Sequence, residues 1–162
     1  MGLNRFRGDE QDNPGRGNWF EGQGVKILVD FAHNEHGMAA LAQMVAAVPA
    51  KRRMLLMGQA GDRLDEDLRL MASAACQMHP DRVLTCALPG YERGRPQSDV
   101  QALIRAACLE SGVQEGAVND FDSPMDAVNW ALDNARDGDL LVLITLTQRD
   151  QVLNAIREFI DS

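Results

Sequence analysis

From Val25 onward, the hydrophobic and polar positions of the chain follow two alternating patterns. Short apolar runs predict buried strands, and apolar residues spaced three or four apart predict amphipathic helices. A helical pattern follows each apolar run, so the elements form five successive pairs of a strand and a helix. The runs that predict strands cover residues 25–30, 53–58, 81–88, 116–121 and 139–145.

Two polar positions predict where helices begin. Ser98 and Gln101 have the spacing of a capping box, which places a helix start at Ser98. Ser123 precedes Pro124, and this pair is typical of an N-cap followed by the first helical residue. The helical patterns after 81–88 and 116–121 therefore both have start signals.

Strands that are apolar on both faces and alternate with amphipathic helices predict an α/β fold. We expect a doubly wound, mostly parallel sheet of five or six strands with helices on both faces, a Rossmann-like arrangement. Residues 1–24 are rich in Gly, Asn, Asp and Arg without a period, which predicts an irregular interdomain linker or tail. Residues 25–162 then form the folded domain.

Composition narrows the classes of protein that fit. A chain of 162 residues with 45% hydrophobic residues suits one globular domain. The net charge of -8 argues against a nucleic-acid binder and against an anionic membrane surface as partner. No apolar stretch predicts a membrane span or a secretory signal. Three cysteines without C-x-x-C spacing predict reduced thiols and a cytoplasmic location.

Ligands of such sheets bind at the carboxyl ends of the strands, so the polar residues after each strand are candidates for function. The segment "VDFAHNEHG", residues 29–37, follows this pattern. His33 and His36 could share a helix face and hold a metal ion, or contact a ligand by hydrogen bonds. Asp30 could accept a hydrogen bond from a sugar hydroxyl or cap the next helix. The segment alone leaves these alternatives open.

Two further loops carry arginines. In "GQAGDRLDED", residues 58–67, Arg63 lies where a helix N-terminus could bind an anion, although the acids there could cap that helix instead. In "GYERGRPQS", residues 90–98, Arg93 and Arg95 flank a glycine and could clamp a carboxylate or phosphate, or simply face solvent. The chain contains no Walker-type phosphate loop.

Four segments in order resemble the C-terminal domain of the Mur ligase superfamily, and most of all the cyanophycin synthetase-like ligases. Together they extend over roughly residues 12–146. The superfamily includes the peptidoglycan amino-acid ligases, folylpolyglutamate synthase and cyanophycin synthetase. The four segments are "NPGRGNWFE" (13–21), "VDFAHNEHG" (29–37), "GDRLDED" (61–67) and "RGRPQSDVQALI" (93–104).

The resemblance implies an ATP-dependent amide ligase that joins a carboxylate to an amino acid through an acyl phosphate. In that family the C-terminal domain closes over a central ATPase domain and completes the ATP and amino-acid sites. By resemblance, Asp30 would face the ATP ribose, and His33 and Asn34 would contact the nucleotide or the closed interface. Arg16 would reach the ATP phosphates.

The same resemblance implies that Arg63 lies near the reaction centre as the catalytic residue, and that Arg93 and Arg95 bind the incoming amino acid. ATP and Mg²⁺ are the implied cofactors. The family's phosphate loop, magnesium ligands and catalytic lysine belong to the central domain, so we expect no metal ligand from this chain. We also expect the domain to be inactive by itself.

Several positions depart from the family pattern and leave the amino-acid specificity open. Glu35 replaces a proline, Phe31 replaces a tyrosine, and Cys86 to Leu88 stand where the family has an acid. Two alternatives remain. The chain could be a non-catalytic module that binds a nucleotide or a protein, or an unrelated doubly wound enzyme with Asp30 and His33 as an acid/base pair.

Overall fold

The computed structural model describes residues 4–5, 18–30, 35–144 and 147–162. The strands are β1 (Asn4–Arg5), β2 (Asn18–Gly22), β3 (Val25–Asp30), β4 (Arg52–Met57), β5 (Arg82–Cys86), β6 (Val118–Phe121) and β7 (Asp139–Ile144). The helices are α1 (Glu35–Ala46), α2 (Asp65–Ala75), α3 (Gln97–Glu110), α4 (Pro124–Asp133) and α5 (Arg149–Asp161). Short 3₁₀ turns lie at Cys76–Met78 and Glu115–Ala117.

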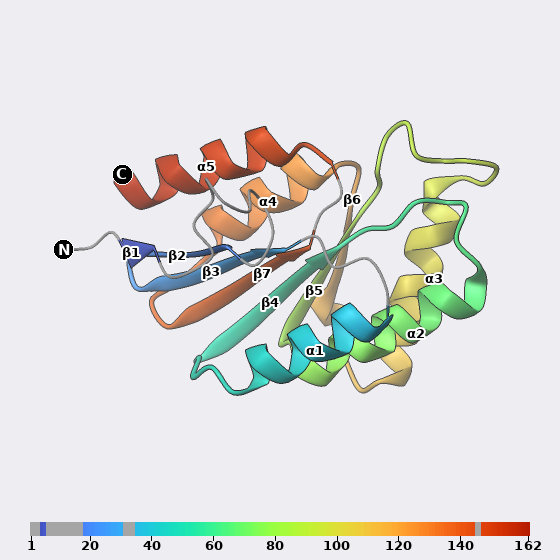
Figure 1. The fold of residues 1–162 in the computed structure, drawn as a ribbon, viewed down its shortest axis with the longest axis horizontal. Helices are drawn as coiled ribbons and strands as arrows, with labels where there is room; N and C mark the ends of the chain where they lie inside the picture. Colours follow the sequence, from blue (N-terminus) through green and yellow to red (C-terminus); the bar gives the residue numbers. More distant parts are fainter. Residues whose placement is uncertain (1–3, 6–17, 31–34, 145–146) are drawn as a thin grey trace.

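The strands form one sheet in the order β1-β2-β3-β7-β4-β5-β6 (Figure 1). The last five strands of this order are parallel, and β2 and β1 add an antiparallel edge. The predicted α/β fold with a mostly parallel sheet is confirmed. The expectation of an irregular segment up to residue 24 does not hold for β2, where buried and half-buried residues alternate from Asn18 to Gly22 as in a strand.

Helices cover both faces of the sheet (Figure 1). α1, α2 and α3 pack on one core cluster, and α4 and α5 pack on the other. The chain steps from β3 to β4, β5 and β6 through α1, α2 and α3 on one face. It then returns to β7 through α4 on the opposite face, as right-handed crossovers require when the direction of travel reverses. This is the doubly wound arrangement expected from the sequence.

The two predicted helix starts have different outcomes. Ser123 caps α4 as predicted, because its Oγ accepts a hydrogen bond from Asp126 N at 3.1 Å. The capping box at Ser98 is wrong, because α3 begins one residue earlier and has no side-chain cap. The Gln101 amide instead donates to Thr85 Oγ1 at 3.0 Å, so it ties α3 to β5 rather than to its own first turn.

A partly buried ion pair joins the amino ends of two central strands, β4 and β7. The Asp139 carboxylate, at the start of β7, accepts hydrogen bonds from Arg52 Nη2 at 2.6 Å and Nε at 3.2 Å. This hydrogen-bonded contact raises the pKa of the Arg52 guanidinium. Two charges that leave water need such paired geometry, so the contact holds β4 beside β7. The carboxyl ends of both strands are thereby aligned at the opposite edge.

Candidate functional site

The carboxyl end of β7 lies at a topological switch point. β3 and β4, which flank β7, lead to α1 and α2 on one face, whereas β7 leads to α5 on the other. In this fold class, ligands bind at such a point, where neighbouring strands send the chain to opposite faces. We call the region above the ends of β3, β7 and β4 the crevice.

Asp30 lies at this crevice. It is the last residue of β3 and pairs in register with Ile144, which also pairs with Met57 at the end of β4. Side chains alternate between faces along a strand. Leu28, two residues before Asp30, belongs to the core beneath α1 and α2, as do Ile144 and Met57. The half-buried Asp30 carboxylate therefore lies at the top of that row, on the α1 and α2 side.

Three predicted nucleotide contacts, Arg16, His33 and Asn34, lie outside the described residues. The alternative of a metal site on His33 and His36 also falls partly outside these residues. Only His36 is described, and it is exposed near the start of α1. Within the described part of the chain, no group of three or more His, Cys, Asp or Glu side chains could hold a metal ion.

The loops after β4 and β5 are hydrogen-bonded to each other; in Figure 1 the loop after β5 rises above the sheet before α3, and the loop after β4 turns down into α2. We call residues 58–63 and 88–97 the loop junction. Gly61 N donates to Tyr91 O at 2.9 Å. A Cβ atom at Gly61 would lie 1.9 Å from Glu92 O, so only glycine permits this approach. The junction brings Arg63 toward Arg93 and Arg95, as the carboxyl-edge argument predicts.

The three arginines have different surroundings in the junction. Arg93 is half-exposed, stacks on the Tyr91 ring with 4.8 Å from Cζ to the ring centroid, and pairs with Asp62 at 3.3 Å. The Arg95 side chain is only 22% exposed. It donates to the Asp65 carboxylate and, through Nη2 at 2.8 Å, to Arg63 O. Arg95 therefore ties the β5 loop to the start of α2, and Arg93 faces the surface.

A hollow of about 420 Å³ lies between the two loops of the junction. Arg63 and Arg93 line it together, and Arg95 does not. Two carboxylates, Asp62 and Asp67, also line it, so the hollow presents both signs of charge. A group that carries a carboxylate and an ammonium fits such a lining better than a bare polyanion does. The remaining lining residues are Ala60, Leu64 and Tyr91.

Gln97 holds the junction together and was missed by the sequence reasoning, which singled out its neighbour Ser98. Its side chain is buried; Oε1 accepts from Leu88 N at 3.0 Å, and Nε2 donates to Gln59 O at 3.0 Å and Tyr91 O at 3.2 Å. A signal was present in the sequence. Gln97 lies three residues before Val100 and seven before Ile104, on the apolar stripe of α3.

Cys86, one of the positions where the resemblance would predict an acid, occupies the end of β5. Burial raises the pKa of its thiol to about 12, so the side chain is neutral at physiological pH. Gly58 packs directly on it, because a Cβ atom there would lie 2.5 Å from Cys86 O. The position therefore adds no charge to the edge of the sheet.

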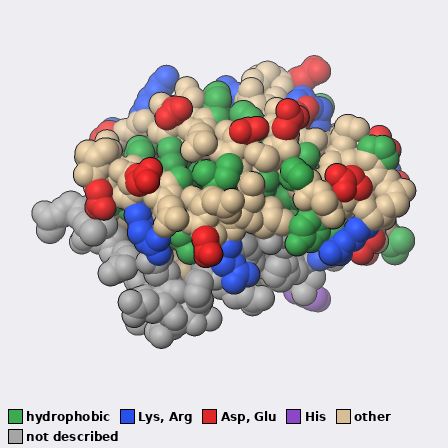
Figure 2. All heavy atoms as spheres, turned by 90° about the horizontal axis from the view of Figure 1, so that it is seen from above, with side chains coloured by type: hydrophobic (Ala, Val, Ile, Leu, Met, Phe, Trp, Pro, Cys, Tyr) green, Lys and Arg blue, Asp and Glu red, His purple; other side chains and the backbone are tan. Residues whose placement is uncertain are grey.

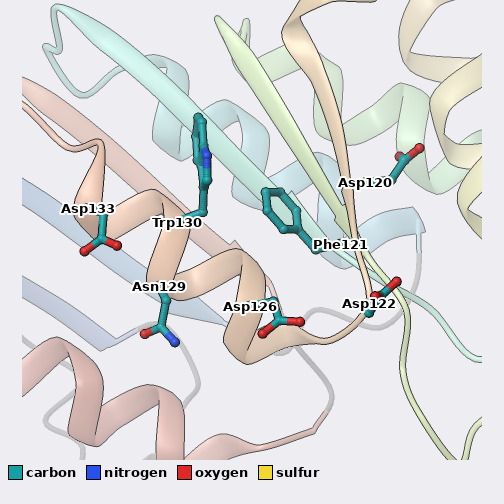
Figure 3. Close-up of a pocket in the computed structure, with 7 residues that line it drawn as sticks. All are labelled: Asp120, Phe121, Asp122, Asp126, Asn129, Trp130 and Asp133. Carbon is teal, nitrogen blue, oxygen red and sulfur yellow. The ribbon is translucent and has the colours of Figure 1, made fainter.

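A second hollow of about 420 Å³ lies between β6 and α4 (Figure 3). Trp130 and Phe121 form its apolar wall, with ring centroids 6.0 Å apart. Four aspartates and Asn129 complete the lining: Asp120, Asp122, Asp126 and Asp133. This concentration of negative charge opposes a nucleotide, whose phosphates carry the same sign. The crevice and the loop junction therefore remain the candidate site for an anionic ligand.

On the surface as a whole, the charges are mixed. Figure 2 shows acidic and basic side chains scattered among hydrophobic ones on the side that lies uppermost in Figure 1, without a continuous basic patch in its coloured part. Among the helices that the structure describes, none is long and apolar enough to cross a membrane.

Comparison with known families decides what this arrangement belongs to. Residues 15–145 match the model of the Mur ligase, glutamate ligase domain. The chain belongs to the Mur ligase family. The match includes Asp30, the segment with Arg63 and the loop with Arg93 and Arg95, so the predicted family is confirmed over most of the sequence.

Curated relatives include cyanophycin synthetase from Crocosphaera subtropica, which is 30% identical over 146 residues. That alignment covers 88% of this chain and 16% of the relative, so the chain spans about a sixth of that protein's length. The UDP-N-acetylmuramoyl-L-alanyl-D-glutamate--L-lysine ligase of Staphylococcus haemolyticus is 26% identical over 74% of this chain and 22% of its own.

Solved structures share the fold. The E. coli FolC complex with ADP has a TM-score of 0.65 at 21% identity and covers 91% of this chain and 31% of its own. The MurF ligase of Thermotoga maritima, also with ADP, has a TM-score of 0.60 at 14% identity and the same coverage. Both proteins were solved with bound ADP. A FolC-type synthase from Yersinia pestis was solved with AMPPNP and a manganese ion.

Proposed function

We propose that this chain is the C-terminal domain of an ATP-dependent ligase that joins a carboxylate to an amino acid through an acyl phosphate. On closure over a central ATPase domain, it contributes contacts to the ATP ribose and phosphates and part of the site for the incoming amino acid. The observation that carries the proposal is the family match over residues 15–145, which includes both Asp30 at the crevice and Arg63 in the loop junction.

The nucleotide side of the proposal rests on the crevice. Asp30 would accept a hydrogen bond from a ribose hydroxyl, because its carboxylate lies at the end of β3 beside the switch point. His33 and Asn34 would contact the nucleotide, and Arg16 would reach its phosphates; these roles are inferred from the resemblance alone. Bound ATP would supply the phosphoryl group that activates the carboxylate substrate.

The amino-acid side rests on the hollow of the loop junction. Arg63 and Arg93 would bind carboxylate or phosphoryl oxygens through forked N–H donors, and Asp62 or Asp67 would attract the ammonium group of an amino acid. Arg63 is the proposed catalytic residue by resemblance to the family, and it lines the hollow just before the start of α2. Arg95, assigned to the amino acid by resemblance, would act by holding Arg63 and the two loops in place.

The other ligase functions would come from a central domain. Phosphoryl transfer requires magnesium and a phosphate-binding loop, which the proposal places in that domain. The 162-residue chain alone is then expected to be inactive. A cytoplasmic location belongs to the same proposal and fits three buried free thiols, Cys76, Cys86 and Cys108. A stand-alone binding module is the second candidate, since the fold has a complete core of its own.

Kinetics of the ligase that carries this domain would test the proposal, with Asp, Arg, Glu and Lys as amino-acid substrates. Arg93→Met should raise KM for the amino acid at least about tenfold, because one charge-assisted contact is lost. Arg63→Met should mainly lower kcat. Arg69→Met is the matched control, because Arg69 is an exposed arginine on α2 outside the hollow.

Unchanged kinetics in both Arg63→Met and Arg93→Met would refute the proposed site. A second assay uses the 162-residue chain alone with MgATP and the same amino acids. Substantial ligation by that sample would contradict the proposed division between two domains. A gene that encodes no phosphate-loop domain before this one, together with ADP binding without ligation, would favour the binding module.

A further inference from the structure

Buried polar side chains in the described part of the molecule fall into two groups. Thr85, Gln97 and Asp139 all make hydrogen bonds that the fold requires. The amides of Asn18 and Gln59 are equally buried, yet neither polar atom of either side chain has a hydrogen-bond partner. Such groups are rare, because an amide without partners loses its contacts with water and gains none in return.

Gln59 is the more informative of the two because of its position. It lies two residues beyond Met57, at the carboxyl end of β4. Gly58 packs on Cys86 and Leu88, which belong to the core beneath α4 and α5. Side chains alternate along an extended chain, so Gln59 points to the opposite side, which is also the side of Asp30. Asn18 lies two residues before Phe20 on β2, so both side chains face the α4 and α5 side instead.

Gln59 also adjoins the hollow of the loop junction. The next residue, Ala60, lines that hollow together with Arg63. β7 alone separates β4 from β3, so the Gln59 amide lies between Asp30 and Arg63 along the carboxyl edge of the sheet. A ligand that extends from Asp30 to the hollow passes the amide on its way.

We propose that Gln59 is a nucleotide-binding residue, and that its buried amide contacts the ribose and phosphate part of an adenine nucleotide in the crevice. The proposal rests on the proposed function, and it adds a contact that the family segments do not assign. An amide suits this part of a nucleotide, because its N–H groups donate to phosphate oxygens and its carbonyl accepts from a ribose hydroxyl. The side chain is fully buried without a ligand and does not itself line the hollow, so its three rotatable bonds would have to turn the amide toward a ligand beside Ala60.

Gln97 is the natural contrast to Gln59. It has the same side chain, is also buried at the same edge of the sheet, and donates to the backbone oxygen of Gln59 at 3.0 Å. Gln97 makes three hydrogen bonds, so a structural role accounts for it fully. The Gln59 side chain makes none. Replacement of Gln59 by an apolar residue of similar length should therefore leave the fold intact and weaken the binding of the ligand.

The test compares wild type, Gln59→Met and Gln97→Met in the 162-residue chain, with ADP as probe. Thermal unfolding without ligand should show an unchanged or raised Tm for Gln59→Met and a clearly lowered Tm for Gln97→Met. Titration calorimetry should show an ADP dissociation constant for Gln59→Met that is higher than that of wild type by roughly tenfold, the loss of a charged hydrogen bond. In wild type, the ¹⁵N signal of the Gln59 side-chain amide should shift on addition of ADP.

The possible outcomes separate this inference from the proposed function. If Gln59→Met lowers Tm as much as Gln97→Met or fails to fold, the amide has a structural role and the inference is wrong. If Gln59→Met folds and binds ADP as well as wild type does, the inference fails and the proposed function stands. If wild type itself binds no ADP and the Gln59 signal stays fixed at millimolar nucleotide, the inference fails, and the kinetics of Arg63→Met and Arg93→Met in the longer ligase decide the proposed function separately.

Discussion

The loop junction and the crevice lie side by side at the carboxyl ends of the strands, yet the polar side chains that face them differ in how many hydrogen bonds they make within the chain. In the junction, Gln97 and Arg95 join the two loops by hydrogen bonds to backbone oxygens and to Leu88 N. The Gln59 amide belongs to the same loops but faces the crevice, and it is buried with no partner for either polar atom. The contacts between the loops are bonded within the chain, although Arg95 Nε has no partner, whereas the Gln59 side chain retains all of its hydrogen-bonding capacity.

This difference separates what the chain does for its own stability from what it offers to a ligand. A paired buried amide contributes to stability, whereas an unpaired one costs about 1–3 kcal/mol and is retained only where another benefit outweighs it. Loops that are bonded to each other also hold nearby side chains still, which a binding site requires. The junction therefore holds Arg63 and Arg93 in place, and the unpaired Gln59 amide is the group that the inference assigns to a ligand.

Among the variants that test this difference, Gln97→Met is expected to cause the largest loss of stability. The change removes three hydrogen bonds; Leu88 N–H and Gln59 O lose this partner, whereas Tyr91 O keeps its bond from Gly61 N. We expect a loss of about 3 kcal/mol in the free energy of unfolding, since each of the two groups that lose it costs about 1–3 kcal/mol when left unpaired. Urea denaturation followed by circular dichroism measures it.

Gln151→Met is the control for that change, because Gln151 is an exposed residue of α5. It should alter the free energy of unfolding by less than about 0.5 kcal/mol. A loss for Gln97→Met as small as that of Gln151→Met would show that the junction does not depend on the Gln97 side chain.

Gly61→Ala should have the next largest effect. The new methyl group would collide with Glu92 O, a backbone atom that cannot rotate away, so the two loops must separate. We expect a loss of about 2 kcal/mol in the free energy of unfolding. Gly116→Ala is the matched control, because a Cβ atom there meets nothing within 4 Å. Equal stability of the two alanine variants in thermal unfolding would contradict the close approach of the loops.

Much of this fold follows from the sequence, because it depends on patterns that repeat locally. Apolar runs placed all five parallel strands, and their alternation with helices predicted a doubly wound sheet with helices on both faces. β2 was missed because its few apolar residues, such as Trp19 and Phe20, follow a stretch dominated by glycine and polar residues. Its pairing with β3 is a tertiary contact that local propensity does not encode.

The site was less predictable than the fold. Family segments and the carboxyl-edge rule correctly predicted that Asp30, Arg63 and Arg93 lie at the carboxyl ends of the strands. They did not distinguish the buried contacts of Arg95 from the exposed position of Arg93, because both arginines flank the same glycine in sequence. Whether a polar residue is satisfied, as Gln97 is, depends on partners that only the folded chain brings together.

The smallest effect, and the one that sharpens the contrast most, comes from Arg95→Met compared with Arg93→Met. Arg95 is mostly covered and bonds to both Asp65 and Arg63 O, so its loss should lower the free energy of unfolding by about 1 kcal/mol. Arg93 and Asp62 are both half-exposed. Solvent screens such a pair, so Arg93→Met should cost less than about 0.5 kcal/mol.

The two variants should rank differently in ligation by the ligase that carries the domain. Arg93→Met acts on the hollow directly and should raise KM for the amino acid, whereas Arg95→Met acts through the position of Arg63 and should mainly lower kcat. Lysine variants separate the two arginines further. Arg93→Lys keeps a positive charge at the surface. In Arg95→Lys, a single ammonium group cannot contact both Asp65 and Arg63 O as the forked guanidinium does. If lysine rescues both variants equally, the distinction between a supporting arginine and a binding arginine is wrong.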